Sequence, residues 1–230
     1  MAPADSFLAD RLAGVRSAVA DAVREAGREP SAVTTIVVTK YHPASLVREL
    51  AALGVTDVGE NRQQEAGEKA AELADLGLDW HFIGQLQSKK TRAVLSFARV
   101  IHSLDRPSLV TALGNALSDG GSVDAFIQLN LTDDPGRGGV QPDDLDAFAE
   151  SVAATRGIRL RGLMAVAAID AEPRAQFARV RELGERVRQV APDATDLSMG
   201  MSGDFREAVL EGATHLRIGT AITGNRPDPG

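Results

Sequence analysis

Lys40 is the side chain in this sequence best placed for covalent chemistry. Residues 34–39, Thr-Thr-Ile-Val-Val-Thr, predict a buried β-strand that ends at this lysine. A lysine is rarely buried unless it is paired or functional. At a strand end, lost solvation and nearby cations can make such an amine nucleophilic and able to form a Schiff base. A lysine that only extends its amine to solvent is the alternative, and the pattern alone leaves both open.

The ends of the last two expected strands predict a phosphate-binding site. Residues 198–203 read Ser-Met-Gly-Met-Ser-Gly, and residues 217–220 read Arg-Ile-Gly-Thr. Glycines let backbone N–H groups approach an anion, Ser202 and Thr220 add hydroxyl donors, and Arg217 adds charge. Plain turn chemistry is the alternative. A phosphate site facing a Schiff-base lysine specifies pyridoxal 5′-phosphate (PLP) better than any other cofactor.

The remaining polar candidates do not indicate a metal site. His81, between Trp80 and Phe82, belongs either to the core or to the lining of a barrel. The 4 histidines are dispersed without a His-x-x-x-His pair, and there is no cysteine. Disulfides, thiolate catalysis and cysteine zinc sites are therefore excluded, and we expect no catalytic zinc.

Short β-rich runs alternate with helical stretches along the whole chain. The expected strands are 34–39, 56–59, 80–83, 100–103, 124–130, 158–165, 196–199 and 215–218. Eight such repeats without a linker predict a single (β/α)8 TIM barrel. An open doubly wound sheet is the alternative, disfavoured because no Gly-x-Gly-x-x-Gly follows the first strand.

One extra helix is expected before the barrel. Apolar residues recur at helical spacing between Phe7 and Val23, and Pro30 ends the element. We therefore expect residues 1–230 to form one domain, with an N-terminal helix inside 1–30 and a tail at 226–230.

Composition and charge restrict the class of protein. The chain has 230 residues, 43% of them hydrophobic, and a formal net charge of −7, which disfavours a nucleic-acid partner. No signal peptide is evident, and no apolar run approaches the ~18 residues that a membrane span needs. The sequence predicts a cytoplasmic protein, and we expect a monomer.

Six segments, in order, resemble one family. They are Val-Val-Thr-Lys at 37–40, Gly-Glu-Asn at 59–61, Trp-His-Phe-Ile-Gly-Gln-Leu-Gln-Ser at 80–88, Arg-Gly-Leu-Met-Ala at 161–165, Leu-Ser-Met-Gly-Met-Ser at 197–202 and Arg-Ile-Gly-Thr-Ala-Ile at 217–222. The sequence resembles the pyridoxal phosphate homeostasis proteins of the YggS/PROSC type. Their barrel is similar to the N-terminal domain of alanine racemase.

The resemblance implies roles for particular residues. Lys40 would carry PLP as a Schiff base, Ser202, Gly219 and Thr220 would hold the phosphate, and Arg217 would lie near it. The full set expected to bind the cofactor is Lys40, Asn61, His81, Ser198, Met199, Ser202, Arg217, Gly219 and Thr220. The sequence departs from the common family pattern at Tyr41-His42 and at Lys89, so a role for a basic residue just after the lysine is in doubt.

The resemblance also implies a carrier without catalytic residues. It would take up PLP, shield the aldehyde and release it to PLP-dependent apo-enzymes. A small amino-acid racemase is the alternative, but it needs a second base, which in alanine racemase is a tyrosine of a separate C-terminal domain. We expect that domain to be absent here. The only tyrosine, Tyr41, adjoins Lys40, which leaves His81 as the substitute.

A Schiff-base aldolase without PLP also fits a barrel with a phosphate site. Its lysine usually lies on a late strand, however, whereas Lys40 ends the first.

Overall fold

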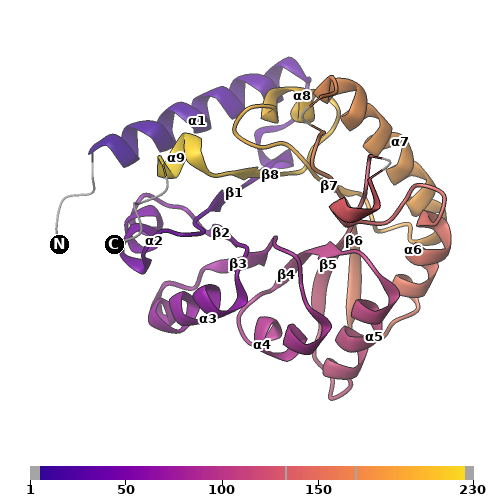
Figure 1. Cartoon of the computed structure of the whole chain (residues 1–230). Helices are drawn as coiled ribbons and strands as arrows, with labels where there is room; N and C mark the ends of the chain where they lie inside the picture. Colours follow the sequence, from indigo (N-terminus) through magenta and orange to yellow (C-terminus); the bar gives the residue numbers. More distant parts are fainter. Residues whose placement is uncertain (1–5, 133, 169, 226–230) are drawn as a thin grey trace.

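Parallel strands form a closed barrel in the computed structural model, which describes residues 6–132, 134–168 and 170–225. Each strand pairs with its neighbours in chain order, and β8 pairs with β1 to close the ring (Figure 1). The strands are β1 (Thr34–Val38), β2 (Asp57–Glu60), β3 (Asp79–Phe82), β4 (Val100–Leu104), β5 (Val123–Gln128), β6 (Ile158–Met164), β7 (Asp196–Ser198) and β8 (His215–Ile218). The predicted (β/α)8 barrel is confirmed, and the doubly wound alternative is wrong.

Helices surround the barrel. They are α1 (Ser6–Glu25), α2 (Ala44–Ala52), α3 (Gln63–Glu72), α4 (Thr91–Leu95), α5 (Pro107–Ala116), α6 (Leu145–Ala153), α7 (Pro173–Val190), α8 (Phe205–Leu210) and α9 (Thr220–Thr223). Short 3-10 turns lie at Pro30–Ala32, Ala74–Leu76, Ser88–Lys90 and Pro135–Arg137.

Among the described helices, none combines the length and the apolar character that crossing a membrane requires. The tail expected at 226–230 lies outside the described residues.

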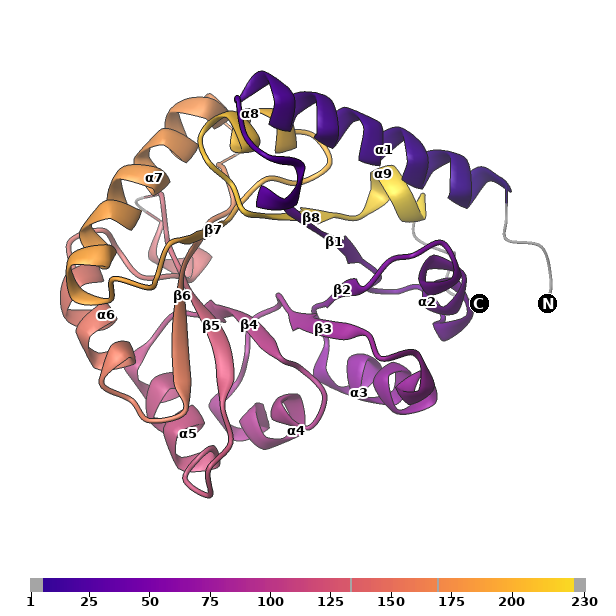
Figure 2. The same ribbon diagram turned by 180° about the vertical axis from the view of Figure 1, so that it is seen from behind.

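The expected extra helix is α1, which packs across α8 and α9 on the outside of the closing strands (Figures 1 and 2). Its apolar stripe, from Leu8 to Val23, is buried, but Phe7 is 71% exposed and does not belong to that stripe as predicted. The Arg11 guanidinium donates to the Ile222 carbonyl at 2.7 Å, which ties α1 to the segment that follows β8.

Side chains on the strands alternate between two environments. Outward residues such as Val37 and Leu216 pack against the helices in one apolar core. Four rings point inward: those of His81 (β3), His102 (β4), Phe126 (β5) and His215 (β8). The ring centres of neighbouring members of this group are 4.6–6.4 Å apart. Rings from strands on opposite sides of a closed barrel meet only inside it, so this interior is partly polar, unlike the branched apolar layers usual in such barrels.

Candidate cofactor-binding site

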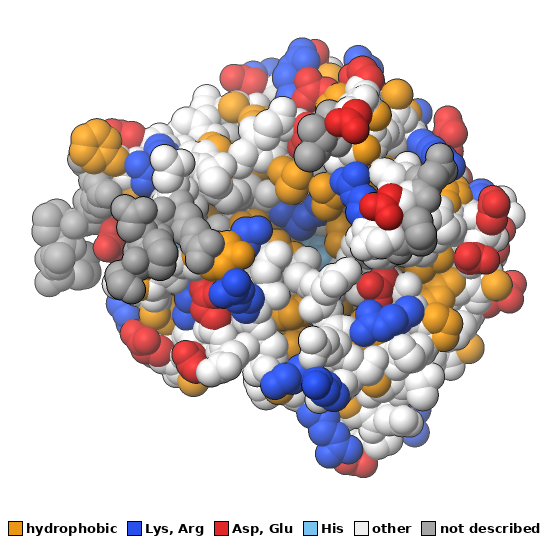
Figure 3. Space-filling view, in the orientation of Figure 1, with side chains coloured by type: hydrophobic (Ala, Val, Ile, Leu, Met, Phe, Trp, Pro, Cys, Tyr) orange, Lys and Arg blue, Asp and Glu red, His pale blue; other side chains and the backbone are white. Residues whose placement is uncertain are grey.

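A pocket of about 450 Å³ opens at the C-terminal ends of the strands. Its lining contains six of the nine residues expected to bind a cofactor: Lys40, Asn61, Ser202, Arg217, Gly219 and Thr220. Its other lining residues are Val38, Ile83, Val166, Met201 and Gly203. The space-filling view shows a hollow in the middle of this face, with basic side chains and hydrophobic side chains around it (Figure 3).

Lys40 stands at this mouth directly after β1. Among the described residues, its Nζ makes no hydrogen bond and no ion pair, and lies 5.9 Å from the centre of the Tyr41 ring. Tyr41 has a φ of 69°, a left-handed conformation that non-glycine residues adopt uncommonly and at some cost. The chain thus turns sharply just after the lysine, and the amine points into the pocket.

A second lysine, Lys69 of α3, fixes the backbone on both sides of Lys40. Its buried Nζ donates to the Thr39 carbonyl at 2.9 Å and to Glu60 Oε1 and Glu65 Oε1, each at 2.8 Å. Glu65 Oε1 also accepts the Tyr41 N–H at 2.6 Å. This ion cluster (Glu60, Glu65 and Lys69) therefore holds the residues before and after Lys40.

Within the ion cluster, Glu60 loses the most solvation, because its side chain is wholly buried. Burial raises the pKa of Glu60, although the hydrogen bond from Lys69 acts in the opposite direction. Thr39 Oγ1 donates to Glu60 Oε1 at 2.7 Å, while Glu60 Oε2 has no partner among the described residues. A buried carboxylate so placed depends strongly on the ammonium beside it.

Opposite Lys40, the loops after β7 and β8 present small polar groups. Ser202 Oγ lies 3.4 Å from the Ala221 nitrogen, which links the two loops. Gly219 has no side chain, and the nearest atom that a Cβ there would meet is 3.5 Å away. Thr220 begins α9 and its side chain is exposed. Hydroxyl donors beside a bare backbone are suited to an anion.

Arg217 brings a buried positive charge to the pocket wall. Its Nη1 donates to Ser198 Oγ at 2.7 Å and its Nη2 to the Ala165 carbonyl at 2.8 Å. Burial lowers the pKa of Arg217 to about 10, although Asp204 acts in the opposite direction. Among the described residues no carboxylate pairs with this guanidinium, and no carboxylate lines the pocket. A cationic pocket of this kind favours an anionic ligand.

Asn61 supplies a polar atom that has no partner among the residues the structure describes. Its Oδ1 is buried and makes no hydrogen bond to the described residues. Gly84 lies against the same residue: a Cβ there would be 2.2 Å from the Asn61 carbonyl oxygen. A buried polar atom without a partner is rare in native proteins, and a bound ligand is one explanation.

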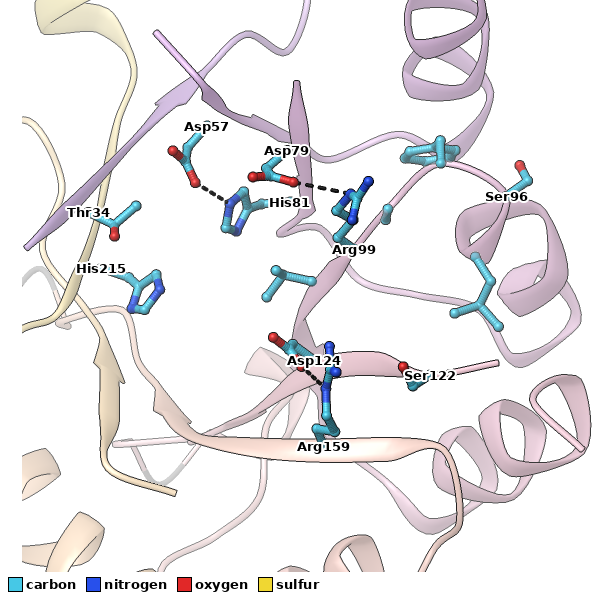
Figure 4. A pocket seen from close by; sticks show the side chains of 14 residues that line it. Thr34, Asp57, Asp79, His81, Ser96, Arg99, Ser122, Asp124, Arg159 and His215 are labelled. Carbon is cyan, nitrogen blue, oxygen red and sulfur yellow. Dashed lines mark hydrogen bonds and ion pairs between the residues drawn. The ribbon is translucent and has the colours of Figure 1, made fainter. Parts of the chain in front are cut away.

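Three of the expected residues do not line this pocket. Ser198 is buried and accepts the Arg217 hydrogen bond, and Met199, which follows β7, is wholly buried. His81 lies near the other mouth of the barrel, where its Nε2 is 3.0 Å from Asp57 Oδ1 (Figure 4). Depth in the barrel explains His81 and Ser198, because both side chains point inward but contact interior residues below the pocket. Strand alternation explains Met199, which follows the inward-facing Ser198.

Sequence reasoning also missed residues that build the site. Val38, Ile83, Val166 and Met201 form its apolar walls, but single apolar residues at strand ends carry no distinguishing signal. Glu60 was visible only as part of Gly-Glu-Asn, and Lys69 only as the partner of Glu65 four residues earlier on a helix, a spacing typical of exposed pairs.

The fold and the site define a parallel α/β barrel in which a lysine amine without a partner among the described residues lies beside a wall of hydroxyl, glycine and guanidinium groups. The alanine racemase N-terminal domain family matches residues 16–227. A pyridoxal phosphate homeostasis protein of Pseudomonas aeruginosa is 42% identical over 222 residues, covering 96% of each chain. One of Corynebacterium glutamicum is 38% identical over 213 residues, covering 89% of this chain and 96% of its own.

A solved structure agrees with these sequence matches. PipY of Synechococcus elongatus, determined with PLP bound, superposes with a TM-score of 0.83 at 38% identity, over 94% of this chain and 100% of its own. The chain belongs to the family of pyridoxal phosphate homeostasis proteins and carries the alanine racemase N-terminal domain. The family expected from the sequence is confirmed.

Proposed function

We propose that this protein binds PLP as a Schiff base on Lys40 and acts in intracellular PLP homeostasis without catalytic turnover. The observation that carries the proposal is the Lys40 amine, which has no partner in the described part of the chain and lies in a pocket whose described lining includes Arg217 and no carboxylate. Bound PLP would supply an aldehyde that condenses with this amine. The curated relatives are named for PLP homeostasis, and PipY was solved with PLP bound.

The residues present fit such a ligand. The pocket volume, about 450 Å³, falls within the range of about 300–1,000 Å³ usual for small-molecule sites. Ser202, Gly219 and Thr220 would hold the phosphate, with Arg217 adding charge. The side-chain amide of Asn61 is available to a polar group of the ligand, through Oδ1 as an acceptor or, with the amide rotated by half a turn, through its nitrogen as a donor.

The acid–base groups of the pocket favour carriage over racemisation. Of its described lining residues, only Lys40 and Arg217 carry ionisable side chains. Racemisation requires a second base on the face of the ligand opposite the lysine. Tyr41 adjoins Lys40 and has the Arg62 guanidinium 4.8 Å from its ring centre, and His81 lies near the other mouth. The lining therefore supports a binding role.

The first test is a visible absorption spectrum of the protein incubated with PLP, before and after borohydride. We expect a Schiff-base band in the wild type and in Lys89→Ala, an exposed lysine outside the pocket. Lys40→Ala should lack the band. Borohydride followed by peptide mass spectrometry should find the reduced adduct on Lys40. An adduct on another lysine, or no band in the wild type, would refute the proposal.

We propose further that the protein is a cytoplasmic monomer that passes PLP to apo-enzymes. The absence of cysteine fits a reducing compartment. Mixing PLP-loaded protein with an apo-aminotransferase should restore transaminase activity while the Lys40 band declines.

Incubation with amino acids in D2O should leave the α-hydrogen unexchanged. Exchange of that hydrogen would show a racemase-like activity, and a dimer in light scattering would contradict the monomer.

A further inference from the structure

A row of hydrogen bonds crosses the interior of the barrel from one mouth to the other. Arg217 Nη1 lies 2.7 Å from Ser198 Oγ, which lies 2.8 Å from His102 Nδ1. His102 Nε2 lies 3.0 Å from His81 Nδ1, and His81 Nε2 lies 3.0 Å from Asp57 Oδ1. The row begins at the pocket of Lys40 and ends at Asp57, beside a second hollow of about 710 Å³ at the N-terminal ends of the strands (Figure 4).

The chemistry of the two ends sets the direction of every bond. A guanidinium only donates, so Ser198 Oγ accepts from Arg217 and its own proton is available to His102 Nδ1. His102 then carries its proton on Nε2 and donates it to His81 Nδ1. His81 in turn carries its proton on Nε2 and donates to Asp57, whose carboxylate only accepts. With both imidazoles neutral, this is the one arrangement that satisfies all four contacts.

The reverse direction is more costly. His81 would have to donate from both nitrogens, as an imidazolium, and Ser198 would have to accept twice and leave its proton without a partner in the row. That imidazolium would share the barrel interior with the Arg217 guanidinium, which has no carboxylate partner among the described residues. Asp57 would pair with that imidazolium, but placing a second cation in the same buried row still carries a desolvation cost.

Burial supports the neutral arrangement. His102 and Ser198 are wholly buried, and His81 is 3% exposed. Burial holds the pKa of His102 well below its usual value, and His81, Arg217 and His215 act in the same direction. Asp57 is the exception: burial opposes its ionisation, but hydrogen bonds from His81 and Thr56 outweigh this and lower the pKa of Asp57. A neutral His102 and a charged acceptor at the end agree with that direction.

We propose that Asp57, His81, His102 and Ser198 are positioning residues that form a one-way hydrogen-bond chain and fix the Arg217 guanidinium in the wall of the cofactor pocket. Because Ser198 commits its proton to His102, its oxygen presents a lone pair to Arg217, and each bond strengthens the next. The role of Arg217 toward PLP rests on the proposed function. The chain itself is a property of the protein without ligand.

The decisive measurement is the ¹⁵N NMR spectrum of the histidine side chains in the protein without PLP near neutral pH. Imidazole nitrogens with and without a proton differ widely in ¹⁵N shift, so the tautomer is read directly. His42→Gln and His215→Gln remove the signals of the other two histidines. We expect His81 and His102 to be neutral and protonated on Nε2. A doubly protonated His81, or a proton on His102 Nδ1, would overturn the proposal.

Variants at the far end test whether the chain sets those tautomers. Asp57→Asn keeps an acceptor oxygen and should preserve the Nε2-protonated state of His81, whereas Asp57→Leu should leave a mixture of tautomers. The control is Asp79→Asn, which lies at the same mouth, pairs with Arg99 at 3.1 Å and is outside the chain. A tautomer unchanged in Asp57→Leu would refute the claim that Asp57 directs the chain.

The last test measures PLP affinity. His102→Phe keeps a ring stacked on Phe126, now 4.6 Å away, but cuts the chain beside Ser198. We expect PLP to bind several-fold more weakly, up to about tenfold, the usual effect of losing one hydrogen bond between neutral groups. Wild-type affinity in a folded His102→Phe protein would refute the positioning role. If the wild type does not bind PLP at all, the proposed function fails, while the NMR result still decides whether the chain exists.

Discussion

At the level of single residues, Lys69 is the side chain whose loss we expect to be most damaging. Its side chain is 7% exposed, and its ammonium donates to Glu60, Glu65 and the Thr39 carbonyl. Lys69→Met should lower the free energy of unfolding by about 3–5 kcal/mol, because it leaves a buried carboxylate without its partner. Urea denaturation measures this loss. The loss should be smaller near pH 5 than near pH 8, since protonation neutralises Glu60.

The control for that prediction is Lys89→Met, because Lys89 is exposed. Its free energy of unfolding should change by less than about 0.5 kcal/mol. Equal losses in the two variants, or a Lys69→Met loss that grows as the pH falls, would contradict the importance assigned to the ion cluster.

The two lysines also show what a sequence can reveal about a residue. Lys40 stands out because it ends an apolar strand, where a charged side chain is uncommon unless it is paired or functional. Lys69 lies on an acidic helix, four residues after Glu65, which is a pattern typical of a solvated surface pair. Only the folded chain shows that β1 and β2 bury it. Long-range packing determines whether a charged side chain is buried, so the sequence around Lys69 does not predict its burial.

At the level of elements, the approach of β3 to the segment after β2 determines where Asn61 lies. A Cβ at Gly84 would lie 2.2 Å from the Asn61 carbonyl oxygen and 2.7 Å from its Cα, so the backbone must move. Gly84→Ala should therefore lower the free energy of unfolding by about 1–3 kcal/mol and also weaken PLP binding. Urea denaturation and a PLP titration measure the two effects.

Gly14→Ala is the matched control for Gly84→Ala. Gly14 lies within α1, and no atom lies within 4 Å of a Cβ built there. This substitution should raise the free energy of unfolding by up to about 1 kcal/mol, because alanine favours a helix, and should leave PLP binding unchanged. Weaker PLP binding in Gly14→Ala, or full binding in Gly84→Ala, would contradict the explanation.

The periodic patterns predicted the strands more accurately than the helices. The expected strand at 158–165 and the observed Ile158–Met164 nearly coincide, because a buried strand needs a run of branched apolar residues. After the third strand, the sequence pattern predicts one helix over 87–98, whereas the structure has a 3-10 turn, Ser88–Lys90, followed by the short helix α4, Thr91–Leu95. The α9 helix, Thr220–Thr223, was not predicted, because four residues contain too little periodicity to detect.

At the level of the whole molecule, the barrel has the candidate cofactor pocket at its mouth and a row of hydrogen-bonded polar side chains in its interior. The mouth could be predicted, because the rule that strand ends carry the site turns a list of strands into a list of residues. The interior could not. The contact between His102 and Ser198 joins residues 96 positions apart, and that between Arg217 and Ala165 joins residues 52 apart. Such contacts depend on strand register, which one sequence does not specify.

The polar interior also predicts how the stability of the whole protein depends on pH. Burial lowers the pKa of His215 from 6.5 to about 4, although Asp196 acts in the opposite direction. Between these values the unfolded chain binds a proton that the folded protein refuses, so stability falls as the pH falls. The contribution of His215 to this loss is about 3 kcal/mol, at about 1.4 kcal/mol for each pH unit of the shift.

Comparing the wild type with His215→Gln isolates that contribution, because every other titrating group is common to both. Urea denaturation from about pH 7 down to about pH 4.5 should show a smaller loss of stability in the variant. Above about pH 7 the two proteins should respond to pH alike, since His215 is neutral in both the folded and unfolded states there. Parallel curves over the whole acidic range would mean that His215 takes up its proton as easily in the folded barrel as in the unfolded chain.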